Sequence, residues 1–84
     1  MLIYVYDIKI KGKREYNTIK RRFYYWLNKF KQKCEKTGEK FIFISKSVVL
    51  IPEKFENEFD DLLLSFQPFL KFSKIKGEMR IESF

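Results

Sequence analysis

One carboxylate, Asp7, stands inside the apolar and aromatic segment MLIYVYDIKI that opens the chain. The chain contains no histidine, which excludes histidine-dependent triads, histidine-ligated metals and histidine general bases. Its single cysteine, Cys34, excludes an intrachain disulfide and a cysteine-rich zinc site. A reaction at any site of this protein would therefore depend on carboxylates, hydroxyls, lysines or a metal-bound water.

Asp7 is open to two interpretations. An acid near the end of a strand commonly pairs with a lysine or bonds to a neighbouring loop, and most such acids are structural. The functional alternative uses symmetry, because a two-fold axis beside Asp7 would bring two carboxylates together from two copies of the chain. Mg²⁺ or Mn²⁺ between them would carry a water able to attack a phosphodiester. Without such a cation, two paired negative charges would cost several kcal/mol.

Basic residues are concentrated in the first half of the chain. The net charge is +7, and twelve Lys or Arg stand against three acids from Lys9 to Lys40. Residues 53–70 are acidic, which suggests a helix that faces away from this region or pairs with basic neighbours. The alternative is a solvated surface typical of heat-adapted proteins. Six cations are candidates for phosphate contacts, three off the apolar stripe of a predicted helix and three in or beside the preceding loop: Arg21, Arg22, Lys29, Lys11, Lys13 and Arg14.

Three further residues carry a hydroxyl or an aromatic ring that a site could use, but structural roles are favoured for them. Ser47, in Ile44-Ser45-Lys46-Ser47-Val48, has no evident base except a lysine, so a turn or backbone-bonding role is favoured over a nucleophile. Phe23 and Trp26 fall on the apolar stripe of the basic helix. We therefore expect these two rings in the core rather than as stacking platforms for bases.

Hydrophobic periodicity predicts six elements in the order β-α-β-β-α-β. The first strand is expected at 2–10, two short strands joined at Ser45-Lys46-Ser47 within 41–51, and the last strand at 77–84. The first helix is expected at about 14–36. The second is expected at 52–67, because Pro52 suits the first turn of a helix and Pro68 would end it. This order predicts a single α+β domain over residues 1–84. Its architecture would be ferredoxin-like, a four-stranded antiparallel sheet with two helices on one face.

The first strand also predicts what lies on the other face of that sheet. Its even positions, from Leu2 to Ile10, would face the helices, whereas Ile3 and Val5 would point the other way. A solvated sheet face should not carry such side chains. We therefore expect a second copy of the chain to cover it, which makes a homodimer.

No segment approaches the roughly 18 apolar residues that a membrane span needs, and the N-terminus lacks the basic region of a signal peptide. Together with the lone cysteine, this predicts a cytoplasmic protein without a membrane partner.

Three segments together resemble the small CRISPR-associated adaptation protein family, Cas two, and the related virulence-associated protein D. They are Val5-Tyr6-Asp7-Ile8 in the first strand, Lys20-Arg21-Arg22 in the basic helix, and Ile44-Ser45-Lys46-Ser47-Val48, which is similar to that family's Ile/Val-Gln-x-Ser-Val segment. This chain departs from the family pattern at Ser45, where the family usually has Gln. It also departs at Val49-Leu50-Ile51-Pro52, which replaces a common Phe-Glu-Gly ending.

The resemblance implies a ferredoxin-like homodimer with Asp7 at the dimer interface as the catalytic and metal-linked residue. Ser47 would be the motif serine, and Arg21 and Arg22 would contact a DNA or RNA backbone. It further implies a role in CRISPR spacer acquisition beside an integrase, with Mg²⁺- or Mn²⁺-dependent endonuclease activity. Two alternatives stay open. One is a non-enzymatic basic adaptor or scaffold whose apolar sheet face docks another protein, and the other is a toxin-type ribonuclease.

Overall fold

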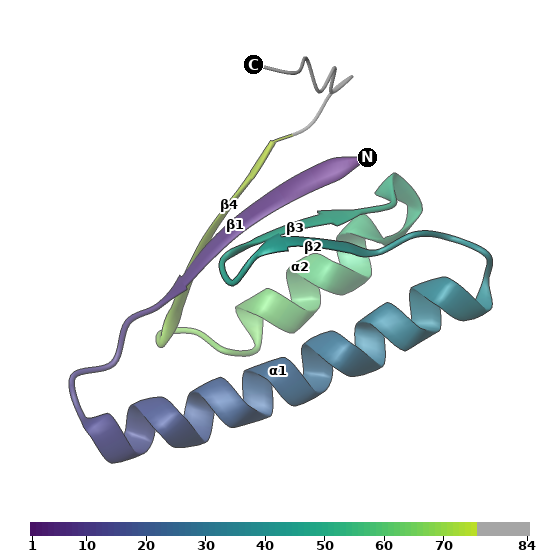
Figure 1. Cartoon of the computed structure of the whole chain (residues 1–84). Helices are drawn as coiled ribbons and strands as arrows, with labels where there is room; N and C mark the ends of the chain where they lie inside the picture. The colour runs from purple at the N-terminus through teal and green to yellow at the C-terminus, as the bar shows by residue number, and fades with distance from the viewer. Residues whose placement is uncertain (76–84) are drawn as a thin grey trace.

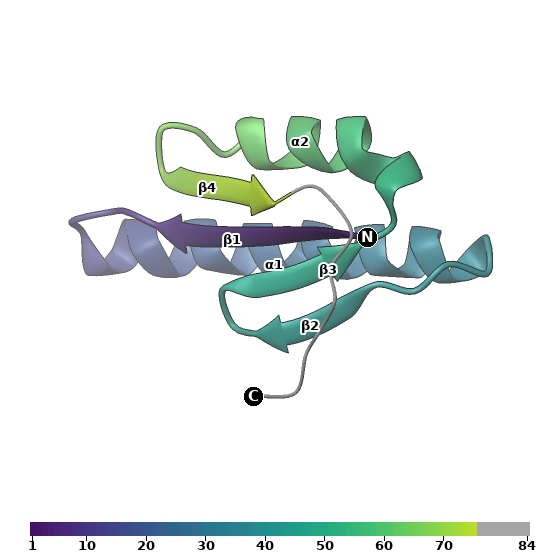
Figure 2. The ribbon, with the colours of Figure 1, turned by 90° about the horizontal axis from the view of Figure 1, so that it is seen from above.

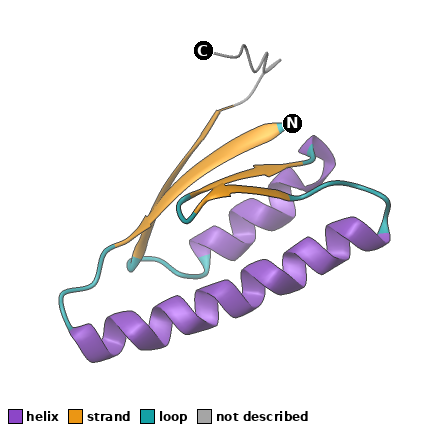
Figure 3. Cartoon of the chain, viewed as in Figure 1, coloured by secondary structure: helices purple, strands orange, loops and turns teal. Residues whose placement is uncertain are grey.

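The computed structural model describes residues 1–75 of the 84-residue chain. The elements are β1 (Leu2–Ile8), α1 (Lys13–Lys36), β2 (Ile42–Ser45), β3 (Val48–Ile51), the 3₁₀ helix η1 (Glu53–Phe55), α2 (Glu56–Leu64) and β4 (Leu70–Ile75) (Figure 1). The strands pair antiparallel in one sheet of order β2-β3-β1-β4. Both helices lie on the same face of that sheet (Figure 3). The predicted ferredoxin-like α+β architecture is therefore confirmed.

The two helices occupy different positions under the sheet. Seen from above the sheet, α1 runs beneath the central strands, whereas α2 lies on the side of β4 (Figure 2). No helix within residues 1–75 is long and apolar enough to cross a membrane. The bounds of α1 match the prediction to within one residue. In contrast, α2 is short and ends at Leu64, ahead of the predicted stop at Pro68.

The fourth strand is not where the alternation of residues 77–84 predicted it; that segment lies outside the described residues. Instead, β4 directly follows the turn at 65–69. Its Leu70 is buried and Phe72 is half-buried, and they pair in register with Ile8 and Tyr6 of β1. The alternation Leu70-Lys71-Phe72 is a period-2 signal, but it is short and directly follows the turn.

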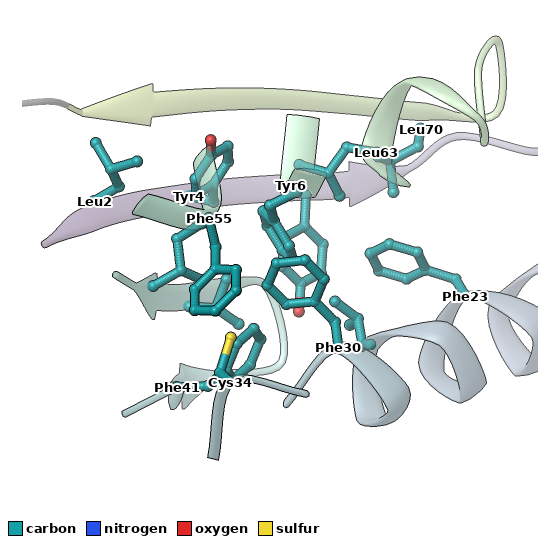
Figure 4. Packing of buried hydrophobic residues seen from close by; sticks show 14 residues of the cluster. Leu2, Tyr4, Tyr6, Phe23, Phe30, Cys34, Phe41, Phe55, Leu63 and Leu70 are labelled. Atoms are coloured by element: carbon teal, nitrogen blue, oxygen red, sulfur yellow. The ribbon is translucent and has the colours of Figure 1, made fainter. Parts of the chain in front are cut away.

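One aromatic-rich cluster fills the space between the sheet and the helices (Figure 4). Three even-numbered residues of β1, Leu2, Tyr4 and Tyr6, belong to it, which confirms the predicted orientation of that strand. The rings pack edge to face: the centroids of Tyr6 and Phe23 are 5.1 Å apart. Such pairs add about 0.5–1.5 kcal/mol to the gain from burial. This cluster fixes α1 and β1 relative to each other.

The opposite face of the sheet carries aliphatic side chains and no helix within residues 1–75 (Figure 1). We call it the open face and define it by six residues that the strand register places side by side: Ile3, Val5, Ile42, Val48, Leu50 and Ile75. Val5 is 43% exposed and Ile75 is 54% exposed. Ile3 and Val5 thus point away from the helices, as predicted.

Candidate nucleic-acid interface

The end of β1 and the β2–β3 turn meet at one end of the sheet. The backbone N–H of Tyr6 donates to the carbonyl oxygen of Ser47 at 2.9 Å, which continues the β1–β3 pairing one step beyond Val5 and Val48. Asp7 is the next residue of β1. The structure therefore brings Asp7 and Ser47, forty positions apart in the sequence, to neighbouring places. Ser47 lies in the turn, and its N–H donates to the hydroxyl of Ser45 at 3.2 Å.

Lysines surround the carboxylate of Asp7. Its side chain is 63% exposed, and the ammonium of Lys9 lies 3.0 Å from one of its oxygens. The register of β4 places Lys71 directly opposite. Residues 1–75 contain no group of three or more His, Cys, Asp or Glu that could hold a metal ion.

This donor set does not fit a divalent cation in a single chain. Mg²⁺ and Mn²⁺ favour several oxygen ligands, whereas Asp7 offers one exposed carboxylate that already pairs with an ammonium. A metal site at this place would need oxygen ligands from outside the chain and displacement of Lys9.

A small hollow of about 130 Å³ lies next to Asp7, between β1, the β2–β3 turn and α1. Its lining includes the two lysines Lys20 and Lys46 and the hydroxyl residue Tyr24. The hydroxyl of Tyr24 donates to the carbonyl oxygen of Lys46 at 3.1 Å, which ties α1 to the turn. Burial raises the pKa of Tyr24 above its ordinary value. The carboxylate residue Asp7 also lines this hollow, so its two lysines lie beside an acid of the same chain.

The six cations predicted to contact phosphate are exposed, and none of them forms an ion pair within residues 1–75. They do not form a single patch. At 100° per residue, Arg14 and Arg21 share the outward side of α1, while Arg22 and Lys29 share the side toward α2. Lys11 and Lys13 lie at the start of the helix. The cations thus line α1 along two rows rather than converging on one point.

Four of the five acids of η1 and α2, in contrast, are paired with cations; Asp61 has no ion pair within residues 1–75. Lys74 of β4 lies 2.7 Å from Glu56 and 2.5 Å from Asp60, and hydrogen bonds to both carboxylates raise its pKa. Glu58 pairs with Lys33, and Glu53 pairs with the N-terminal ammonium at 3.6 Å. Most of the acidic charge of this segment is thus neutralised locally, as one of the sequence interpretations expected.

Trp26 corrects the sequence analysis, which placed it in the core. Its side chain is 50% exposed, whereas Phe23, three residues earlier, is fully buried as predicted. Trp26 lies at the edge of the apolar stripe, on the side toward α2. Sequence reasoning also missed Lys20, Tyr24 and Lys46 of the hollow. The only signal for them was the basic and aromatic composition of 20–26 together with the lysine in the turn.

Comparison of the chain with protein-family models, curated proteins and solved structures found no match.

Proposed function

We propose that the protein binds the phosphate backbone of nucleic acid through α1, the loop before it and the β2–β3 turn. The observation that carries this proposal is the one-sided distribution of unpaired charge. Six cations of this flank have no ion pair within residues 1–75: Lys11, Lys13, Arg14, Arg21, Arg22 and Lys29. Lys9, Lys31 and Lys33 of the same region are paired, as are four of the five acids of η1 and α2. Lysines and arginines that neutralise phosphates release condensed counterions, which drives binding.

We propose further that two copies associate through the open face. Three aliphatic residues of this face, Val5, Ile42 and Ile75, are exposed, and Ile3 and Val48 beside them are half-buried, so the face presents an apolar patch that water solvates poorly. Face-to-face pairing of two such sheets leaves both α1 helices on the outside, so both basic surfaces stay free for nucleic acid. With its resemblance to the CRISPR adaptation family, such a dimer would support DNA during spacer acquisition beside an integrase.

Metal-dependent cleavage of phosphodiesters is the second candidate function. The position of Asp7 favours it, since this carboxylate follows Val5 on the same side of β1 and therefore borders the open face. Within one chain the donors do not fit a divalent cation, so cleavage would require the carboxylate of a second copy. Backbone binding makes no such demand, and we rank it first.

Fluorescence anisotropy with a labelled oligonucleotide tests the binding proposal. Affinity should fall on the order of a hundredfold between about 50 and 200 mM salt, because several phosphates are neutralised together. An affinity that does not change with salt would contradict backbone binding.

Adding Mg²⁺ to the parent and to Asp7→Asn tests cleavage, which only the parent should show.

Light scattering tests the dimer. The parent should have twice the mass of one chain, and Val5→Lys should be monomeric because it places a charge on the open face. Thr18→Lys is a matched control, since it adds the same charge on the exposed outer side of α1. A monomeric parent, or a Val5→Lys variant that stays dimeric, would contradict association through this face.

A further inference from the structure

A second hollow, of about 520 Å³, lies between α1 and the end of α2. Five apolar residues and one cation account for most of its lining: Ile19, Arg22, Trp26, Leu62, Phe66 and Phe69. No carboxylate contributes to this lining. We call it the tryptophan groove. It is separate from the hollow beside Asp7, which lies on the other side of α1.

The geometry points to an unpaired nucleotide base as the occupant of the tryptophan groove, an inference that rests on the proposed backbone binding and names its substrate class. Trp26 lies between two cations of one helix row, Arg22 four residues before it and Lys29 three residues after it. These two cations are about 10 Å apart along the helix axis. A base stacked on the indole of Trp26 would thus have its flanking phosphates within reach of cations on either side.

Contacts within α1 hold this row in place. The ring of Tyr25 packs edge to face against the indole of Trp26, with centroids 5.3 Å apart. The ammonium of Lys29 lies over the ring of Tyr25, 5.5 Å from its centroid. The indole therefore has one side supported by protein, while half of its surface remains exposed.

Two observations favour a base over an apolar peptide. The groove is continuous with the row of cations formed by Arg22 and Lys29, because Arg22 belongs to that row and also lines the groove. In addition, the side-chain amide of Gln67 lines the groove and has no hydrogen-bond partner within residues 1–75, so it can meet the polar edge of a base. Aromatic platforms next to basic residues bind single-stranded nucleic acid with little sequence preference. Bases inside a duplex are stacked on one another, so the substrate is single-stranded, or a duplex with an unpaired end.

Trp26 is the only tryptophan of the chain, so its fluorescence reports on this groove alone. A single-stranded oligonucleotide should quench this emission saturably, whereas a blunt duplex should bind with little quenching. Trp26→Leu should weaken single-strand binding about tenfold, since stacking of one base is worth about that much. The same change should leave duplex affinity and its salt dependence unchanged.

Trp26→Phe keeps a ring at the site and serves as the second variant, with an affinity expected close to that of the parent. Suppose that binding depends on salt, does not quench the emission of Trp26, and is as tight for Trp26→Leu as for the parent. This result would overturn base stacking in the tryptophan groove and leave the backbone-binding proposal intact. Absence of binding to any oligonucleotide would overturn both proposals. Quenching by a glutamate-rich peptide, but not by the oligonucleotide, would assign the groove to a protein partner and also overturn the inference.

Discussion

The two flanks of the sheet treat charge in opposite ways. On the flank of α2 and β4, Lys74 lies between Glu56 and Asp60, and the hydroxyl of Tyr4 donates to Asp60 at 2.5 Å. On the flank of α1, Arg14 and Arg21 make no ion pair within residues 1–75. Most acids of the first flank are thus neutralised within the domain, whereas these two arginines of α1 stay exposed without an ion pair within residues 1–75.

Two lysines of β4 show what causes this difference. Lys74 pairs in register with Tyr4, whose side chain faces the helices, and so it reaches the acids of α2. Lys71 pairs with Asp7 and therefore belongs to the opposite face. The period of two along a strand thus decides which lysine is neutralised inside the domain. Net charge alone does not show this.

Truncating a core side chain that joins the two flanks should cause the largest loss of stability. The ring of Phe23 is fully buried and packs against Tyr6 and Phe66 at centroid distances of 5.1 and 5.2 Å. Phe23→Ala should cost about 3–5 kcal/mol of unfolding free energy, measured by urea denaturation. Tyr25→Ala is the control, because its side chain is 54% exposed and should change stability by less than about 1 kcal/mol. Equal losses in the two variants would contradict the described packing.

Removing a carboxylate from the flank of α2 and β4 should lower the stability of the fold by a moderate amount. Asp60→Ala removes the acceptor of the buried Tyr4 hydroxyl and one carboxylate of Lys74. We expect a loss of about 1–3 kcal/mol, mainly from the hydroxyl left without a partner. Asp61→Ala, a change of the same charge at an exposed neighbour, should be nearly neutral. If the two variants were equally stable, the network around Asp60 would not contribute to folding.

Raising the pH into the alkaline range should lower the stability of the fold through Tyr4, a residue of the same hydrogen-bond network. Burial first, and then the hydrogen bond to Asp60, raises the pKa of Tyr4 far above its ordinary value of 10.0. The unfolded chain loses this proton near pH 10 while the folded chain keeps it, so stability should be constant below that pH and fall above it. Urea denaturation at pH 8 and pH 11 measures the difference. Tyr4→Phe should show a shallower fall, and a parent equally stable at both pH values would contradict this assignment.

The sequence was sufficient for most of the fold because local patterns were strong. Apolar residues recur through α1 at spacings of three and four, and its predicted and observed bounds differ by one residue. The alternation of β1 assigned Tyr4 and Val5 to opposite faces correctly. The prediction missed β4 at Leu70–Ile75, where the alternating signal is short and directly follows a turn.

The site depends on contacts that a single pattern does not contain. Helical periodicity placed Trp26 on the apolar stripe and predicted it in the core, but it could not show that α2 ends at Leu64 and that half of the indole is exposed. The proximity of Asp7 to Ser47 follows from strand register, and the pairing of Lys74 with Asp60 follows from packing. These long-range relations decide which charges are free, and that question is the basis of the proposed function.

The most direct test of the central claim compares the salt dependence of oligonucleotide binding for two double variants of equal net charge. Arg14→Gln with Arg21→Gln removes two unpaired cations of α1, whereas Lys31→Gln with Lys54→Gln removes two cations that pair with Glu35 and Glu39. Because each lost phosphate contact reduces the slope of log affinity against log salt by about 0.7–0.9, the first variant should have a slope lower by about 1.5. The second should keep the slope of the parent. Equal slopes for the two variants would contradict the account, because binding would then follow total charge rather than the unpaired cations of α1.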